Sequence, residues 1–162
     1  MRKLLAVLVI VAIPVLYFLY AFQQETPLVP PVIDEDMPLI RIGTVPLRVE
    51  VADTPEERAR GLGGRESLGA TNGLLFVFDE SGYHAIWMRD VSFPIDVLWV
   101  GEDFTVVDIL PNLSPETFPR AFEPRAPARF VIETNANYAA SSGIVVGDMV
   151  TIPRAFIPEE LW

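Results

Sequence analysis

The sequence predicts a mainly β domain, an antiparallel sandwich or barrel of about eight short strands with one or two short helices. Short apolar runs rich in β-branched and aromatic residues recur from residue 39 to residue 152, and turn-forming residues separate them. The regular strand–helix alternation of a parallel sheet is missing from this pattern. A long uncharged segment, Leu4 to Phe22, precedes the domain and predicts an N-terminal transmembrane helix.

The N-terminal segment, residues 1–22, is interpreted as an uncleaved signal anchor. Its 19 uncharged residues follow Arg2 and Lys3, and as a helix they would span about 28 Å, close to the thickness of a bilayer core. A cleaved signal peptide is the alternative, but Ala21 lacks a small partner at the spacing that cleavage requires. The two basic residues place the amino terminus in the cytoplasm and the domain on the extracytoplasmic side of the cell membrane.

Residues 23–38 are expected to form an extended linker to a domain spanning residues 39–162. The linker contains four prolines and the acidic run Asp34-Glu35-Asp36. Proline and like charge both favour an extended chain over a packed element.

The domain is expected to begin with strands at Leu39–Ile42 and Pro46–Ala52, on either side of a turn at Gly43. The clearest helix signal in the chain follows, from Thr54 to Gly61. Thr54 is suited to cap this helix, Pro55 fits its first position, and Glu57 completes a capping box.

The remaining elements alternate between apolar runs and turn-forming residues. The pattern predicts turns at Asp79–Gly82 and Arg89–Pro94, a long loop from Pro111 to Pro127, and a helical turn at Asn137–Ser142. Further strands are expected at Leu74–Phe78, Tyr83–Met88, Ile95–Val100, Phe104–Leu110, Ala128–Thr134 and Met149–Ile152.

Composition excludes several classes of function. The chain carries a net charge of −10, and because Arg2 and Lys3 lie in the anchor, the rest has ten arginines against 22 acids, a net charge of −12. Such an acidic domain repels phosphate backbones, so no nucleic-acid partner is expected. The absence of cysteine excludes thiol nucleophiles, disulfides and thiolate metal sites. One histidine cannot form a histidine-rich metal site, and no cofactor is predicted.

Six residues form the candidate functional surface. Asp96 is the most informative, because it alternates with Leu98 and Val100 on an otherwise apolar side of its strand. A charge there needs a partner, either an arginine (Arg65 or Arg89) or the amides of a loop. The six residues are Arg65, His84, Trp87, Arg89, Asp90 and Asp96.

Structural roles compete with chemical roles at these positions. We favour a hydrogen-bonded structural role for His84 over general-base catalysis, and an anchoring role for Asp96 behind a functional turn at Arg89–Pro94. Asp90 and Asp96 also permit a paired-carboxylate hydrolase. Trp87 and Trp99 are more typical of a core than of a sugar platform. The amides of Gly63 and Gly64 could suit an anion, but a helix end explains the two glycines without a ligand.

Four blocks of sequence resemble the domain-of-unknown-function 192 family. This chain differs from the usual family pattern at Gly63, where methionine is common, and at Asp90, where asparagine is more frequent. The resemblance implies a compact, mainly β fold, often behind a signal peptide or anchor, and it implies no activity. The blocks are VEVADTPEERARGLGGRESL (Val49–Leu68), GLLFVFDE (Gly73–Glu80), IWMRDVSFPIDVLWV (Ile86–Val100) and GIVVGDMV (Gly143–Val150).

The sequence therefore predicts a membrane-anchored extracytoplasmic domain with a noncatalytic binding or accessory role in the cell envelope. Expected partners are the membrane, through the N-terminal helix, and an envelope glycan, a small ligand or another protein. The alternative is an envelope hydrolase acting on glycans through Asp90 and Asp96.

Overall fold

The computed structural model describes residues 37–161. The predicted anchor, residues 1–22, lies outside the described residues, as does nearly all of the predicted linker. Within residues 37–161, no helix has both the length and the apolar character needed to cross a membrane.

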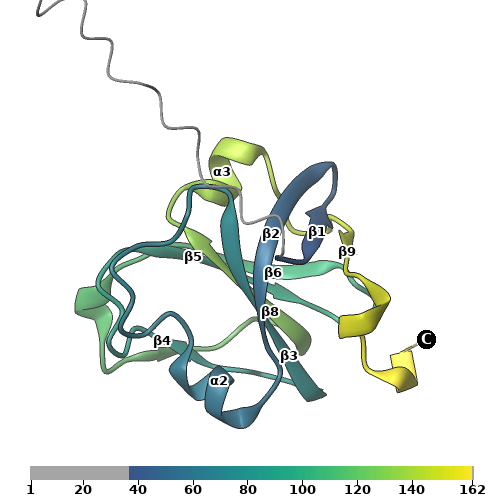
Figure 1. The fold of residues 1–162 in the computed structure, drawn as a ribbon, viewed down its shortest axis with the longest axis horizontal. Coiled ribbons are helices and arrows are strands. Elements are labelled where there is room, and N and C mark those ends of the chain that lie inside the picture. Colours follow the sequence, from purple (N-terminus) through teal and green to yellow (C-terminus); the bar gives the residue numbers. More distant parts are fainter. Residues whose placement is uncertain (1–36, 162) are drawn as a thin grey trace, which may run out of the picture. The chain divides into compact units, whose positions relative to one another are not determined.

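A seven-stranded sheet forms the framework of the domain, which is mainly β as predicted (Figure 1). Its strand order is β6-β5-β8-β3-β2-β1-β9. Neighbouring strands are antiparallel except β2 and β3, which are parallel. The strands are β1 (Leu39–Ile42), β2 (Val45–Ala52), β3 (Asn72–Gly82), β5 (Ile95–Val100), β6 (Val106–Leu113), β8 (Ala128–Asn135) and β9 (Val150–Thr151).

The sheet curls so that its two edge strands meet at one end. Thr105 and Met149, just before β6 and β9, form an antiparallel bridge. Two backbone hydrogen bonds reinforce it: the Val106 amide donates to the Asp148 carbonyl (2.9 Å), and the Val150 amide donates to the Phe104 carbonyl (2.7 Å). The result is a half-barrel that protects part of both sheet edges.

Both faces of the curled sheet are covered, and this produces two apolar cores. The concave core includes Ile40, Leu47, Leu98, Val100, Phe130 and Ile132. The convex core includes Leu74, Phe76, Ile86, Met88, Val97, Trp99 and Val131. Burial on both faces explains why β5 is buried at all six positions and why its sequence is almost continuously apolar.

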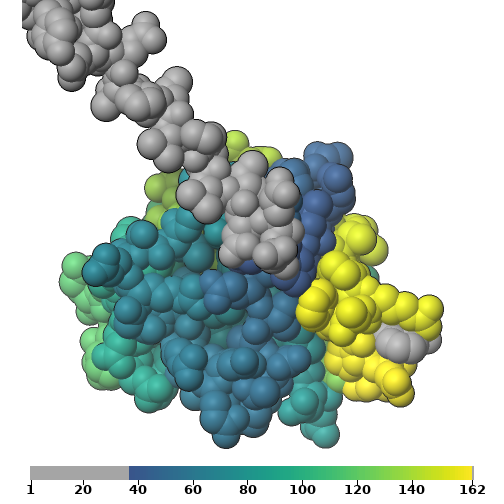
Figure 2. Space-filling view, in the orientation of Figure 1, coloured from purple at the N-terminus to yellow at the C-terminus, as the bar shows by residue number. Residues whose placement is uncertain are grey.

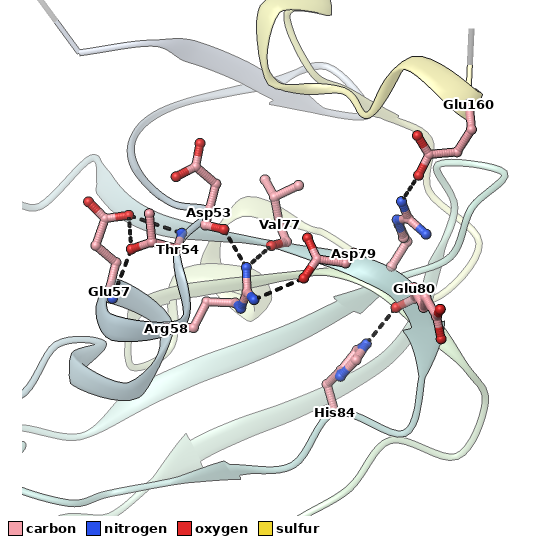
Figure 3. Close-up of polar contacts among 10 residues, drawn as sticks. Asp53, Thr54, Glu57, Arg58, Val77, Asp79, Glu80, His84 and Glu160 are labelled. Atoms are coloured by element: carbon pink, nitrogen blue, oxygen red, sulfur yellow. Dashed lines mark hydrogen bonds and ion pairs between the residues drawn. The ribbon is translucent and has the colours of Figure 1, made fainter.

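The convex face is covered by a helix and a small second sheet. Helix α2 (Pro55–Arg60) begins at Thr54, whose hydroxyl accepts a hydrogen bond from the Glu57 amide, while the Glu57 side chain accepts one from the Thr54 amide (Figure 3). The predicted capping box is therefore confirmed. The second sheet pairs β4 (Ile86–Trp87) with β7 (Ala121–Phe122).

The remaining helical elements are short. Helix α3 (Tyr138–Ser142) ends at Gly143, as the sequence predicted. Single 3₁₀ turns occur at η1 (Pro115–Thr117), η2 (Arg154–Phe156) and η3 (Glu159–Leu161). The last two belong to the C-terminal segment, shown in yellow along one side of the domain in Figure 2, and Glu160 pairs there with the buried Arg129.

Three local expectations differ from the structure. The predicted turn at Asp79–Gly82 is the end of β3, which continues to Gly82 across an irregularity in its pairing with β8. The predicted strand Tyr83–Met88 pairs only over Ile86–Trp87. The predicted loop Pro111–Pro127 contains the end of β6, one 3₁₀ turn and β7. In the first and third cases, pairing with a distant segment overrides the local turn signal, whereas in the second an apolar run finds a strand partner only at Ile86–Trp87.

Candidate functional site

A small pocket lies on the convex side of the sheet, between the end of α2 and the segment 85–91 that contains β4. We call it the α2 pocket. Its enclosed volume is about 40 Å³, enough for a few atoms. It is lined by Arg58, Ala59, Arg60, Gly61, Leu62, Phe76, Ala85, Ile86, Trp87, Arg89, Val91 and Glu133.

Glu133 is the buried acidic residue of this pocket. It lies on β8, where it is opposite Leu74 of β3 and Val97 of β5, and the residue is 4% exposed. Its Oε2 atom has no hydrogen-bond partner among the described residues. Burial raises the pKa of the Glu133 carboxyl to about 8, against the opposing positive charge of Arg65. Glu133 is therefore largely protonated at neutral pH.

The end of α2 has a conformation that leaves room beside Glu133. Gly61 terminates the helix with φ 53°, and a Cβ atom at this position would lie 3.8 Å from Glu133 Oε2 and 3.4 Å from the Phe76 ring. Glycine is therefore favoured here by the positive φ, whereas a Cβ atom would make only ordinary van der Waals contacts.

Arg58 secures α2 to the sheet. Its guanidinium donates hydrogen bonds to the backbone carbonyls of Asp53 and Val77, the latter at 2.8 Å, and pairs with Asp79 (Figure 3). It also lies over the Phe78 ring. These contacts occupy Arg58 and make it a structural part of the pocket wall.

Arg60 and Arg89 are the more available cations. Arg89 donates a hydrogen bond to the Ala59 carbonyl (2.9 Å) and lies over the Trp87 ring (4.9 Å to its centroid). Arg60 is exposed and makes no ion pair with any described residue. Both arginines also line a broader, open depression of about 590 Å³, together with Glu56, Ala59, Gly63, Gly64 and Asp90.

Three of the six candidate residues predicted from the sequence lie together at this site. Trp87, which is 44% exposed, and Arg89 line the α2 pocket, and Asp90 lines the adjoining depression. Arg65 lies outside both lining sets and pairs with Glu50 of β2, with one N–O distance of 2.8 Å. The hydrogen bond to Arg65 lowers the pKa of Glu50.

His84 lies apart from the pocket and has a structural environment. Its ring stacks on Phe78 at a centroid distance of 3.6 Å, and its Nε2 lies 2.9 Å from the Glu80 carbonyl oxygen (Figure 3). The His84 backbone carbonyl also accepts a hydrogen bond from the indole of Trp99. These contacts agree with the structural interpretation of His84.

Asp96 is buried away from the pocket, and the predicted pairing with Arg65 or Arg89 is wrong. Its carboxylate instead accepts three backbone amide hydrogen bonds: from Asn112 (2.9 Å), Asn137 (3.1 Å) and Ala139 (3.0 Å). Asp96 thus fixes β6 and the start of α3, and it does not support the Arg89–Pro94 turn. The alternative partner named from the sequence, loop amides, is the correct one.

Two alternatives that the sequence left open for this surface are not supported. Asp96 is 0% exposed, so it does not share an open cleft with Asp90 as a paired-carboxylate hydrolase requires. The Gly63 and Gly64 amides donate to the Arg60 and Asp90 carbonyls and are not available to an anion. Among residues 37–161, no group of three or more His, Asp or Glu side chains is placed to hold a metal ion.

Sequence analysis missed Glu133 and Arg60. The segment Ala128–Thr134 was interpreted only as a strand, although a glutamate directly after Val131 and Ile132 is the same signal that singled out Asp96. Arg60 gave no such signal, because an arginine in the last turn of a helix is common.

Two solved structures are similar to this chain. A candidate transcription regulator from Sinorhizobium meliloti 1021 has 29% sequence identity and a TM-score of 0.67, covering 71% of this chain and 92% of its own. A protein of unknown function from Novosphingobium aromaticivorans DSM 12444 has 34% identity and a TM-score of 0.65, covering 70% of this chain and 82% of its own.

Comparison with curated proteins finds no match. The sequence profile of DUF192, described as uncharacterized ACR, matches residues 39–152. This range contains all four blocks that suggested the resemblance, together with both sides of the α2 pocket. The chain belongs to the DUF192 family.

Proposed function

We propose that this protein is a noncatalytic binding module that takes a small ligand in the α2 pocket. The observation that carries the proposal is the unpartnered carboxyl oxygen of Glu133 in a pocket bordered by arginines and an exposed tryptophan. Leaving a buried polar group without a partner costs about 1–3 kcal/mol. A ligand that supplies the missing hydrogen bond recovers part of this cost, which makes the pocket a better binding site than a structural cavity.

The proposal places the domain outside the cytoplasm, tethered to the cell membrane. The support is the uncharged segment Leu4–Phe22 behind Arg2 and Lys3, followed by the proline-rich acidic linker. Protease protection in intact and permeabilised cells tests this placement. Release of the full-length protein into the soluble extracytoplasmic fraction would contradict the anchor.

Two other functions have less support. A hydrolase using Asp90 and Asp96 lacks an exposed second carboxylate, because the oxygens of Asp96 are occupied by backbone amides. The S. meliloti neighbour is named as a candidate transcription regulator, but the net charge of −12 on residues 23–162 disfavours DNA binding by this chain. Binding of a small ligand needs neither a second exposed carboxylate nor a positively charged surface for DNA.

Thermal unfolding of the full-length protein in detergent tests the binding function. A ligand that binds only the folded state raises the melting temperature, so a panel of glycans, metal ions and small anions should contain at least one stabilising compound. The matched variant is Ala59→Phe, which places a bulky ring at the mouth of the pocket on an exposed helix position. Stabilisation should disappear in this variant. A panel without effect, or an effect that survives Ala59→Phe, would contradict the proposal.

A further inference from the structure

We infer that the ligand of the α2 pocket carries a carboxylate, which accepts a hydrogen bond from the carboxyl group of Glu133 and is balanced in charge by Arg60 and Arg89. This inference rests on the proposed binding function and names the chemical class of the ligand. Neither the family description nor the descriptions of the two similar proteins assign a ligand to this position.

The charge around the pocket argues for an anion. Three arginines line it, from positions 58, 60 and 89, whereas its one acid is Glu133. The chain as a whole has nearly two acids for each basic residue, so this region reverses the general charge. Because Arg60 has no acidic partner among the described residues, an anionic ligand would supply its missing counter-charge.

The state of Glu133 argues for a hydrogen-bond acceptor. A protonated carboxyl has one O–H donor, and a hydrogen bond from it to a carboxylate oxygen is of the strong, charge-assisted kind. Its cross-strand neighbours, Leu74 and Val97, do not titrate. The charged group that acts on Glu133 most directly is Arg65, from the segment after α2, and Arg65 is itself paired with Glu50 of β2. The other charged residues of the pocket are arginines: Arg58 and Arg60 from α2, and Arg89 from the segment after β4.

An amine is the opposite possibility, because it would pair with ionised Glu133. It would, however, have to lie in a pocket lined by Arg60 and Arg89 and hold Glu133 in the charged form that burial disfavours. The carboxylate requires neither of these unfavourable steps. A volume of about 40 Å³ also admits a carboxylate head group, while the rest of a larger acid lies in the adjoining depression.

Acetate is the simplest probe, and its titration into the full-length protein in detergent tests the inference. Ethylammonium chloride and sodium chloride at equal ionic strength are the comparison salts, and protein NMR shifts report binding. Acetate stays ionised from pH 7 to pH 9, whereas Glu133, with a pKa of about 8, loses its proton. If only protonated Glu133 binds, affinity for acetate falls about tenfold between pH 7 and pH 9.

Variants of Glu133 and Arg60 separate the contribution of the hydrogen-bond donor from that of the positive charge. Glu133→Gln keeps a neutral donor, so acetate should bind at pH 7 within about threefold of wild type but without the loss at pH 9. Glu133→Met removes the donor and should weaken binding about tenfold or more. Arg60→Gln should also weaken it, whereas Arg41→Gln, an exposed arginine on β1, should leave it unchanged. Circular dichroism establishes that each variant is folded.

The outcomes distinguish this inference from the proposed function. If a glycan or metal ion binds and Ala59→Phe blocks it while acetate does not bind, the carboxylate inference is wrong and the binding function stands. Acetate binding that is equal at pH 7 and pH 9, or unchanged in Glu133→Met, overturns the inference, as does preferential binding of ethylammonium. If no compound binds in a manner sensitive to Ala59→Phe, both fail.

Discussion

Two buried carboxylates on neighbouring strands, Asp96 and Glu133, have opposite environments. Asp96 of β5 accepts three backbone amide hydrogen bonds, whereas Oε2 of Glu133 on β8 has no partner among the described residues. In the register, Asp96 is opposite Thr134 and Val97 is opposite Glu133, so the two side chains emerge on opposite faces of the sheet. Burial alone therefore does not assign a role: a satisfied carboxylate holds the fold together, and an unsatisfied one marks a site.

The largest expected effect on the free energy of unfolding comes from replacing Glu133, whose carboxyl oxygen lacks a hydrogen-bond partner. Glu133 has a pKa of about 8 in the folded state against its ordinary value of 4.5, so between these two values the folded state keeps a proton that the unfolded state has lost. Wild-type stability should therefore decrease as the pH rises through this window, and Glu133→Gln, which does not titrate, removes the decrease. Relative to wild type, the variant should gain about 4 kcal/mol at pH 8 and almost nothing at pH 4.5. Urea unfolding of both proteins from pH 4.5 to pH 8.5 measures this difference, and parallel curves would refute it.

Replacing Asp96, whose carboxylate is fully hydrogen-bonded, should lower the stability of the protein. Asparagine has one acceptor oxygen where Asp96 uses two, and its NH₂ group would face a backbone amide that is also a donor. Asp96→Asn should therefore destabilise the protein by about 3 kcal/mol at neutral pH. A shift in the urea midpoint measures the loss, and a loss below about 0.5 kcal/mol would mean that these amide bonds contribute little.

An exposed polar contact extends the comparison to the surface. Thr54, which is exposed, caps α2 through its hydroxyl, and Glu57 is half-buried. Thr54→Ala should cost about 1 kcal/mol, less than Asp96→Asn, because water replaces part of the lost bond. Ser81→Ala, at an exposed position on β3, is the control and should have no effect. Equal midpoints for the two variants would show that the cap does not stabilise the domain.

The smallest effect is expected at an exposed carboxylate. Asp90 has φ 59°, a left-handed conformation that asparagine also tolerates, and its side chain makes no ion pair with a described residue. Asp90→Asn should therefore change stability by less than about 0.5 kcal/mol in the same urea assay. A loss comparable to that of Asp96→Asn would contradict the distinction between buried and exposed carboxylates drawn here.

The sequence predicted what depends on local patterns. The capping box at Thr54–Glu57 and the run Ile95–Val100 follow from short-range signals, and the alternation around Asp96 correctly indicated a buried charge that needs a partner. It did not indicate which partner, because the amides of Asn137 and Ala139 come from a segment about 40 residues away. The choice between loop amides and an arginine is made by the tertiary fold.

The α2 pocket was harder to predict for the same reason. Its walls come from the end of α2 and from the segment around β4, which meet through the hydrogen bond between Arg89 and the Ala59 carbonyl. Trp87 and Arg89 were identified as candidates, but no local pattern connects them to Glu133. The signal that the sequence offered was Glu133 itself, an acidic residue within an apolar strand that needs a partner elsewhere in the fold.

The protonation state of Glu133 is the central claim, and a ¹³C NMR titration of its side-chain carboxyl group measures it most directly. The full-length protein labelled at glutamate is followed from pH 4 to pH 10, with Glu133→Gln used to identify the resonance. The account predicts a pKa near 8 that rises further when acetate is added, because the ligand favours the protonated form. A pKa near 4.5, unchanged by acetate, would contradict it.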